Sequence, residues 1–284
     1  MSRLASQTPY DRAAMSYGQV GPPLFAHFGR RLADLADLLP DMSVLDVAAG
    51  TGAVTLPAAE RVGRGGLVLG IDASIAMLTQ LRQAVATRGL TNVHACALDA
   101  EHVDTLRANF DSVLCGFAID SLRNPQLTLS RCRRIIRKGG TIALSVAPGW
   151  WWEGDHRWRW HEELIKSLGV PTRTRHERLC DAECIRTLLE QAQFERVSVI
   201  PERFRLSFTS ASEWWRWIWS HGFRQVLEQM DQSQLVKYEA ACYAEFEKVP
   251  GKNNRRSTPG IYLSGPRVNR VRISGRRSAA SHAS

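Results

Sequence analysis

The chain has 284 residues, of which 44% are apolar and 23% charged, a composition typical of a globular protein with one large α/β domain or two small ones. No run approaches the roughly 18–20 apolar residues that a membrane helix needs, and residues 1–17 lack the apolar core of a signal peptide, so we expect neither a membrane-spanning nor a Sec-exported protein. The six cysteines are scattered along the chain, which argues against a disulfide scaffold and indicates a cytoplasmic protein.

The net charge of +9 comes from one end of the chain. Residues 248–284 hold nine basic residues and no acidic one, whereas residues 1–247 carry 28 residues of each sign. A basic tail serves phosphate contacts in some proteins, but a solvated end without function is the more frequent case. We therefore do not expect nucleic acid as a partner, and we expect residues 275–284, rich in Ser, Ala and Arg, to be disordered.

The first half of the chain alternates between apolar runs and helical patterns. An amphipathic segment at 24–39 is expected to lie over a sheet edge or to close a ligand site. The expected strands that follow are 43–47, 66–72, 93–97, 110–115 and 141–146, with helices at 54–62, 75–88 and 126–136. This alternation predicts a doubly wound, mostly parallel sheet, which binds ligands at the carboxyl ends of its strands.

The second half has a different character, because all nine tryptophans lie between Trp150 and Trp219. The elements expected there are helices at 158–168, 180–193, 211–230 and 234–248 and strands at 196–208 and 260–273. The sequence thus divides into a helical amino-terminal cap at 1–40, a core at 41–147, a Trp-rich substrate cap that completes the sheet at 148–274, and the tail at 275–284.

A turn of small residues follows the first expected strand, directly after Asp46. Small side chains let a ligand approach the backbone closely, so such a turn suits either a dinucleotide or an adenosyl cofactor. For a dinucleotide fingerprint, glycines would stand at Ala48, Gly50 and Ala53, and two of these three are absent. The carboxylate of Asp46 would repel a pyrophosphate but accept hydrogen bonds from an ammonium group.

Two further acids follow the next two expected strands. Asp72 lies about 20 residues beyond the turn, where a carboxylate can hold both hydroxyls of a ribose. Asp99 is suited to accept from an adenine amino group. Three acids at three successive strand ends, with no phosphate-binding lysine or serine in the turn, indicate a cofactor with ribose and adenine but no phosphate.

These residues resemble the first motif of the class I S-adenosylmethionine-dependent methyltransferases, acid-x-Gly-x-Gly-x-Gly. Asp46, Ala48, Gly50 and Gly52 match it, with alanine in place of the first glycine, and the resemblance extends over 10–146. It implies a doubly wound, seven-stranded Rossmann-like sheet whose last strand is antiparallel. It also implies S-adenosylmethionine as the cofactor, S-adenosylhomocysteine as the product, and no metal.

The resemblance implies roles for individual residues as well. Asp72 would bind the ribose, Met77 would pack against adenine, and residues Cys115 to Ala118 would line the methyl donor. Tyr10 and Tyr17 look like the amino-terminal element of ubiquinone-type and secondary-metabolite methyltransferases, whose tyrosines close over the cofactor's carboxylate or the substrate. The expected cofactor-binding residues are Tyr17, Asp46, Ala48, Gly50, Gly52, Asp72, Ala73, Met77, Asp99, Ala100 and Cys115.

The Trp-rich substrate cap indicates which class of acceptor molecule would bind. For any single tryptophan, packing against the sheet is the more frequent role, yet all nine lie in the region that would cover the substrate. A water-poor aromatic pocket suits a bulky apolar acceptor and could steady cationic character. Residues 212–222 also look like the cap of antibiotic-pathway enzymes of actinomycetes. The expected substrate-binding residues are Phe25, Phe117, Trp150, Trp214 and Trp217.

Methyl transfer from a sulfonium relies mainly on proximity, and a general base is needed only if the acceptor must lose a proton. The candidate bases are His156, which follows the fifth strand between two tryptophan groups, then Tyr10 and His221. A surface or structural role is the alternative for each histidine. His176 and Cys180, with Cys184 four residues further on, offer only three ligands and no CxxC pair, which does not indicate zinc.

We therefore predict a cytoplasmic, homo-oligomeric methyltransferase that acts on carbon or oxygen of a bulky apolar or aromatic small molecule, prenylated or not, in bacterial secondary metabolism. The alternatives are a methyltransferase of quinone biosynthesis, an RNA-directed methyltransferase that uses the basic tail, a non-catalytic adenosyl-binding scaffold, and a nicotinamide oxidoreductase. Sequence alone does not separate carbon from oxygen as the methylated atom.

Overall fold

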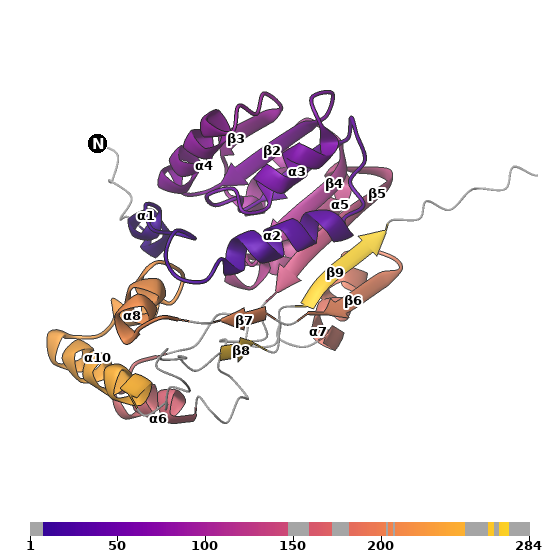
Figure 1. The fold of residues 1–284 in the computed structure, drawn as a ribbon. Coiled ribbons are helices and arrows are strands. Elements are labelled where there is room, and N and C mark those ends of the chain that lie inside the picture. Colours follow the sequence, from indigo (N-terminus) through magenta and orange to yellow (C-terminus); the bar gives the residue numbers. More distant parts are fainter. Residues whose placement is uncertain are drawn as a thin grey trace, which may run out of the picture.

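The computed structural model describes residues 8–146, 159–171, 182–202, 204–206, 208–247, 261–263 and 267–272. Its centre is a sheet with the strand order β3-β2-β1-β4-β5-β9-β6 (Figure 1). The strands of this sheet are β1 (Ser43–Val47), β2 (Leu67–Asp72), β3 (Val93–Ala97), β4 (Phe110–Gly116), β5 (Ile136–Val146), β6 (Val197–Pro201) and β9 (Arg267–Arg272). β1 to β5 pair in parallel, and β9 lies antiparallel between β5 and β6. The predicted α/β fold class is confirmed.

The strand β1, which lies in the middle of the five parallel strands, is apolar on both faces. Val44, Leu45 and Val47 are at most 1% exposed. Successive side chains of a strand point to opposite faces, and accordingly Val44 belongs to one apolar cluster and Leu45 to another. A strand covered on both sides reads as a continuous apolar run, which is why the sequence pattern located it. Asp46 is the exception near its carboxyl end.

Helices cover the two faces of the sheet. On one face lie α2 (Leu24–Leu35), which packs on β4 and β5, α3 (Thr55–Val62), which packs on β1 and β2, and α4 (Ile75–Thr87), which packs on β2 and β3. On the other lie the 3-10 helix η1 (Ala100–Thr105), α5 (Pro125–Ile135) and α7 (Ala182–Gln191). This is the doubly wound arrangement, and it leaves the carboxyl ends of the strands as the place where a ligand can reach the loops.

The remaining elements form a cap beyond those strand ends, drawn below the sheet in Figure 1. The cap contains α6 (Arg159–Ser167), α8 (Ala211–Trp219), α9 (Arg224–Leu227), α10 (Gln232–Glu247) and the strand pair β7 (Phe204–Leu206) and β8 (Ile261–Leu263). Tyr238 of α10 is fully buried, and its hydroxyl lies 2.5 Å from Nε2 of His161 on α6. This buried contact fastens two cap helices together.

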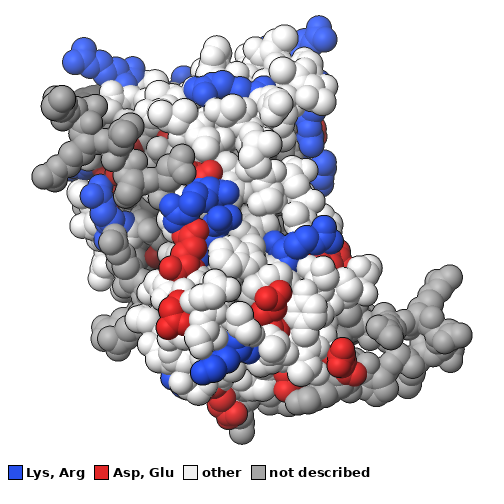
Figure 2. Space-filling model, turned by 90° about the vertical axis from the view of Figure 1, so that its left-hand side faces the viewer, with Lys and Arg blue, Asp and Glu red and all other residues white. Residues whose placement is uncertain are grey.

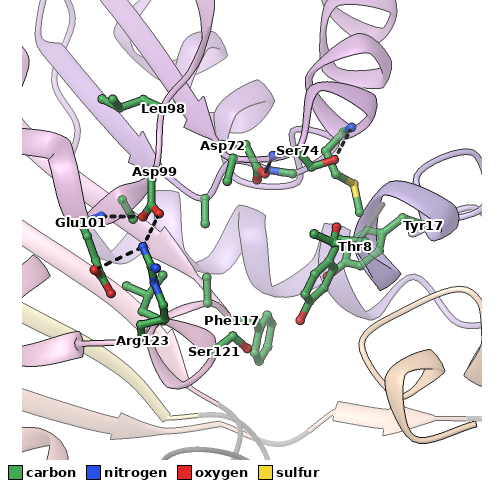
Figure 3. A pocket seen from close by; sticks show the side chains of 18 residues that line it. Thr8, Tyr17, Asp72, Ser74, Leu98, Asp99, Glu101, Phe117, Ser121 and Arg123 are labelled. Carbon is green, nitrogen blue, oxygen red and sulfur yellow. Dashed lines mark hydrogen bonds and ion pairs between the residues drawn. The ribbon is translucent and has the colours of Figure 1, made fainter. Parts of the chain in front are cut away.

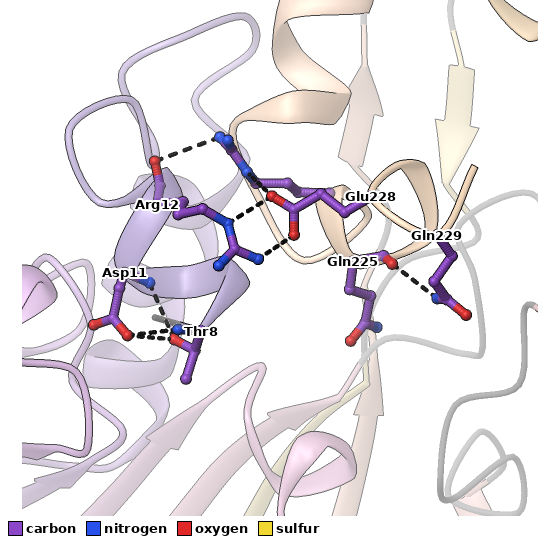
Figure 4. Close-up of polar contacts among 7 residues, drawn as sticks. Thr8, Asp11, Arg12, Gln225, Glu228 and Gln229 are labelled. Atoms are coloured by element: carbon purple, nitrogen blue, oxygen red, sulfur yellow. Dashed lines mark hydrogen bonds and ion pairs between the residues drawn. The ribbon is translucent and has the colours of Figure 1, made fainter. Parts of the chain in front are cut away.

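The short helix α1 (Pro9–Ala13) lies between α4 and the cap. A capping box starts it, because the Thr8 hydroxyl accepts from the Asp11 backbone N–H and the Asp11 carboxylate accepts from the Thr8 N–H. Nε of Arg12 donates to Glu228, just after α9, over 2.7 Å, and Arg224 donates to the same carboxylate (Figure 4). The amino-terminal segment is thereby joined to the cap.

Three expected elements are each divided in the structure. The strand expected at 196–208 is β6 and β7, which belong to different sheets, and between them Glu202 accepts from Nε of Arg31 on α2. The strand expected at 260–273 is β8 and β9 in the same way. The helix expected at 211–230 ends at Trp219, where the Ser220 hydroxyl donates to the Trp217 carbonyl, and resumes as α9. Local patterns missed these breaks because tertiary partners set them.

The charges on the face shown in Figure 2 are mixed, with Lys and Arg next to Asp and Glu and no large field of either sign. None of the helices in the described ranges is long and apolar enough to cross a membrane. Trp150, His156, His176, Cys180 and residues 275–284 lie outside the described residues.

Candidate functional site

A cavity of about 380 Å³ opens at the carboxyl ends of β1 to β4, with Thr8 and Tyr17 of the amino-terminal segment on one side (Figure 3). A second cavity of about 40 Å³ adjoins it, and the two share Tyr17, Ala48, Gly50 and Phe117. The larger cavity is lined by Thr8, Tyr10, Tyr17, Ala48, Gly50, Asp72, Ala73, Ser74, Met77, Leu98, Asp99, Ala100, Glu101, Phe117, Ala118, Ser121, Leu122 and Arg123. Most of the expected cofactor-binding residues are therefore brought together.

The turn after β1 exposes backbone to the cavity. Ala48, Gly50 and Gly52 have positive φ angles of 56°, 54° and 99°. A Cβ at Gly50 would meet nothing within 4 Å, so this glycine leaves open space toward the cavity that it lines. A Cβ at Gly52 would lie 2.6 Å from Cδ1 of Leu81, so that glycine serves the packing of the turn against α4. Gly50 therefore keeps space open in the cavity, whereas Gly52 allows the turn to pack closely against α4.

Asp72 ends β2 and is fixed by two backbone donors. Gly50 N–H donates to Oδ2 over 2.8 Å, and Ser74 N–H donates to Oδ1 over the same distance. Burial raises the pKa of Asp72, while these two donors oppose the shift. Each oxygen keeps a second lone pair, and the two together offer acceptors spaced for a pair of neighbouring hydroxyls.

Asp46 is only 1% exposed and lines the smaller cavity. Its Oδ2 accepts from the Thr55 hydroxyl over 2.5 Å, while Oδ1 has no hydrogen-bond partner among the described residues. Burial raises the pKa of Asp46 to about 7. A buried carboxylate oxygen without a donor is costly, and a ligand that brings an N–H group there would relieve that cost.

At the far end of the larger cavity, Asp99 caps η1 by accepting from the Glu101 N–H over 2.9 Å. Its other oxygen accepts from Nη2 of Arg123 over 2.8 Å. Leu98 and Ala100 add apolar surface beside Asp99, and Met77 of α4 lines the same cavity. A flat apolar slot with hydrogen-bonding groups at its edge is suited to a purine.

Aromatic residues separate the two cavities. Tyr17 stacks on Phe25 with ring centroids 4.7 Å apart, and Phe25 meets Phe117 edge-on at 6.0 Å. Phe117 has a φ of 51°, a strained angle for a phenylalanine, and its N–H donates to the Ser145 carbonyl over 3.0 Å. Burial raises the pKa values of both Tyr10 and Tyr17, so both hydroxyls stay protonated near neutral pH.

His221 lies beside this aromatic group but not on the cavity lining. It is 2% exposed, its ring lies 4.4 Å from that of Trp217, and its Nδ1 accepts from the Phe223 N–H over 3.2 Å. Burial lowers the pKa of His221 to about 3, so the ring is neutral in the ordinary pH range. A group with so low a pKa is a poor proton acceptor, which argues against His221 as a general base.

The structure also differs from the expectations for Cys115, Trp214 and Trp217, which do not line either cavity. Cys115 is 3% exposed and lies in the cluster beneath α5, because its position on β4 points to that face. Trp214 and Trp217 are 2% and 4% exposed and pack α8 onto the cap and α2. Phe25, by contrast, lines the smaller cavity and Phe117 lines both.

Some lining residues were not anticipated from the sequence. These are Thr8, Ser74, Leu98, Glu101, Ser121, Leu122 and Arg123. Several are immediate neighbours of the strand-end acids, so extending each motif by two residues would have found Ser74, Leu98 and Glu101. Arg123 follows η2 (Ile119–Ser121), where the sequence offered no motif. Among the described residues, no group of three His, Cys, Asp or Glu side chains could hold a metal ion.

A family model described as a methyltransferase domain matches residues 38–194. The chain is 32% identical over 269 residues to nocamycin O-methyltransferase of Saccharothrix syringae, an alignment that covers 90% of this chain and 96% of that protein. This chain belongs to the S-adenosylmethionine-dependent methyltransferase family.

Two further similarities agree with this family. The methyltransferase is 34% identical over 136 residues to aklanonic acid methyltransferase DauC of Streptomyces sp. (strain C5), which covers 48% of this chain and spans 62% of that relative's length. Among solved structures, phosphoethanolamine N-methyltransferase 2 of Haemonchus contortus, in complex with phosphomonomethylethanolamine and S-adenosylhomocysteine, superposes with a TM-score of 0.54 at 16% identity. That match covers 93% of this chain and 57% of the other, and it shows the shared fold.

The residues of the site fit the cofactor of this family on three points. Gly50 leaves open the space that a side chain would fill, Asp72 offers two fixed acceptors, and Asp46 has an oxygen without a partner among the described residues. These features match, in turn, a closely approaching ligand, a ribose and an ammonium group.

Proposed function

We propose that this methyltransferase binds S-adenosylmethionine along the two adjoining cavities and transfers its methyl group to an oxygen of a bulky apolar small molecule of bacterial secondary metabolism. One observation carries the proposal: the acids of three consecutive strand ends, Asp46, Asp72 and Asp99, line two cavities that share a wall. Their order along the sheet corresponds to the ammonium, ribose and adenine of one extended ligand.

Different residues would bind different parts of the cofactor. Asp99, Ala100 and Met77 would hold adenine, Asp72 with Ala73 would hold the ribose, and Gly50 would let the ligand pass close to the backbone. Asp46 would accept from the ammonium group, directly or through water. When bound, the cofactor supplies a methyl group on a positively charged sulfur.

The protein's contribution to the reaction is then placement and exclusion of water. The rings of Tyr17, Phe25 and Phe117 lie where the two cavities meet, so an acceptor seated against them would be aligned with the donor. Aromatic faces attract a nearby cation by about 0.5–2 kcal/mol. Holding two reactants in line is the main source of acceleration in such a displacement.

Oxygen is supported as the acceptor atom by the likeness to nocamycin O-methyltransferase, which extends over nearly the whole chain. A second relative is named for an acid as its substrate. We propose an acceptor with an acidic oxygen, a carboxylic acid or an acidic hydroxyl, which is ionised before it binds. This agrees with the low pKa of His221 and the raised pKa of Tyr10, since neither group is poised to take up a proton near pH 7.

The first experiment is calorimetric titration with S-adenosylhomocysteine, with NADH for comparison and Asp72→Ala as the control variant. We expect micromolar binding of S-adenosylhomocysteine that is lost in Asp72→Ala. Absence of binding, or preference for NADH, would overturn the proposal. With binding established, acids, phenols and prenylated aromatics are offered with S-adenosylmethionine, and mass spectrometry with fragmentation identifies whether oxygen or carbon carries the new methyl group.

A further inference from the structure

Arg123 is the cation of the larger cavity's lining, and two acids hold it there. Its Nη2 lies 2.8 Å from Oδ2 of Asp99 and 3.5 Å from Oε2 of Glu101. Oε1 of Glu101 in turn accepts from the Asn124 N–H over 2.9 Å. Arg123 precedes α5, whereas both acids follow β3, so the three side chains join two loops across one end of the cavity (Figure 3).

Fold stability does not explain this arrangement. The side chains of Arg123 and Asp99 are 60% and 43% exposed, and ion pairs that exposed contribute between nothing and about 1 kcal/mol. What the contacts accomplish is to fix the guanidinium group of a long and otherwise flexible side chain. Glu101, only 14% exposed, gives it an anchor that solvent does not screen.

The surroundings define what the guanidinium faces. Leu98 and Ala100 flank Asp99 in the chain and supply apolar lining there, and Leu122 adds to it from the residue before Arg123. A guanidinium is planar, weakly hydrated and stacks on aromatic faces, which an ammonium does not do. An apolar slot edged by a held guanidinium and by a carboxylate suits a flat, nitrogen-rich ring.

We propose that Arg123 is a specificity-determining residue that closes over the adenine ring of the cofactor, held in that position by Asp99 and Glu101. The inference rests on the proposed function and extends it to a residue that no family motif marks. Asp99 then does two things at once: it accepts from Arg123 through one lone pair of Oδ2 and keeps others for the amino group of adenine. The sulfonium end of the ligand is untouched by this contact.

The test compares two ligands that share adenosine but differ at the other end, S-adenosylhomocysteine and 5′-methylthioadenosine. Binding of each is measured by calorimetry for the wild type, Arg123→Ala and Arg123→Lys. We expect Arg123→Ala to raise the Kd of both ligands by the same factor, about tenfold. Arg123→Lys should restore only part of the lost affinity. In turnover, the KM for S-adenosylmethionine rises while kcat at saturating cofactor stays unchanged.

The matched control is Arg88→Ala. Arg88 also forms an exposed ion pair, with Glu60 at 2.9 Å, but it lies away from the cavity lining. We expect Arg88→Ala to bind both ligands as tightly as the wild type does and to melt at about the same temperature as the wild type. If Arg123→Ala binds as tightly as wild type, or if its loss is confined to S-adenosylhomocysteine, the inference is wrong and the proposed function stands. If the wild type itself does not bind, the proposed function fails.

Discussion

The hydroxyl of Ser74 donates a hydrogen bond to Oδ1 of Asp11 over 2.5 Å, and this contact joins the amino-terminal helix α1 to the wall of the cavity. The same hydroxyl caps α4 by accepting from the Met77 N–H. The next residue of α1, Arg12, pairs with Glu228 beside α9. The helix that carries Tyr10 is thus fastened to the cofactor side through Asp11 and to the cap through Arg12.

These two attachments have separable effects. Asp11→Ala removes the Ser74 contact together with the capping box, so we expect the Kd for S-adenosylhomocysteine to rise about tenfold, a change of about 1.4 kcal/mol. Arg12→Ala leaves the Ser74 contact in place, and we expect unchanged cofactor affinity with a higher KM for the acceptor. Calorimetry and steady-state kinetics check both. Equal effects of the two variants on cofactor affinity would contradict this division.

Asp46 gives the protein a pH-dependent stability. Its pKa is about 7 in the folded chain against a usual value of 3.8, so the native state binds a proton that the unfolded state releases between these values. Stability from this group is therefore present at low pH and declines as pH rises toward 7. Asp46→Asn removes the buried charge, and we expect it to melt several degrees above wild type at pH 8, with little difference at pH 4.

The same carboxyl group makes cofactor binding pH-dependent in the opposite sense. Only the anion attracts an ammonium group, so the Kd for S-adenosylhomocysteine is expected to rise as pH falls below 7. 5′-Methylthioadenosine has no ammonium group and should show no such trend. Titrations at pH 6 and pH 8 distinguish the two ligands, and Asp46→Asn should flatten the profile of the first. A parallel pH trend for both ligands would count against a role for Asp46.

Gly50 and Gly52 should respond differently to the same substitution. Gly50→Ala places a methyl group in open cavity space, so we expect a folded protein that has lost cofactor binding, destabilised by about 1–2 kcal/mol through its positive φ. Gly89→Ala, also at positive φ with open space around it, is the control for that backbone cost. Gly52→Ala forces Leu81 to move, and we expect a further 1–3 kcal/mol of destabilisation. Urea unfolding and calorimetry check these outcomes.

His221 should affect acceptor placement and not proton transfer. Because its pKa is about 3, the ring is neutral across the working range, and a kcat profile between pH 5 and 9 should have the same shape in wild type and His221→Gln. We expect kcat/KM for the acceptor to fall by roughly ten- to a hundredfold, since the ring supports Phe25 and Trp217. Loss of a titration step near pH 6–7 in the variant would restore His221 as a base.

Much of the sheet could be predicted from local pattern. β1 and β3 begin and end where the sequence placed them, because a strand buried on both faces, or one bounded by clear turns, is specified by its own residues. The positions of the strand-end acids Asp46, Asp72 and Asp99 could be predicted as well, because they depend only on where the strands end. Asp72 and Asp99 line the larger cavity and Asp46 the smaller one beside it, while their ligand contacts stay a prediction.

The cap could not be predicted in the same way. The helix expected at 211–230 ends at Trp219, and Gly222 just beyond it has little room for a side chain, because a Cβ there would lie 3.1 Å from the Tyr10 hydroxyl. That constraint comes from a residue more than 200 positions away. Likewise the tryptophans of α8 looked like pocket residues by composition, but Trp214 and Trp217 face the apolar cluster between α8, α2 and α10. Amino-acid composition alone does not distinguish a helix face that packs in an apolar core from one that lines a cavity.

Gly29 on α2 has no room for a side chain, because a Cβ there would lie 2.0 Å from the Ala53 carbonyl oxygen in the turn after β1. Four residues earlier on the same helix, and so on the same side of it, Phe25 lines the smaller cavity. One helix therefore combines a position where no side chain fits with a position whose ring lines the smaller cavity. Under the proposed function, the helix that presents Phe25 to the acceptor is held at a fixed distance from the cofactor turn by the close approach of Gly29 to Ala53.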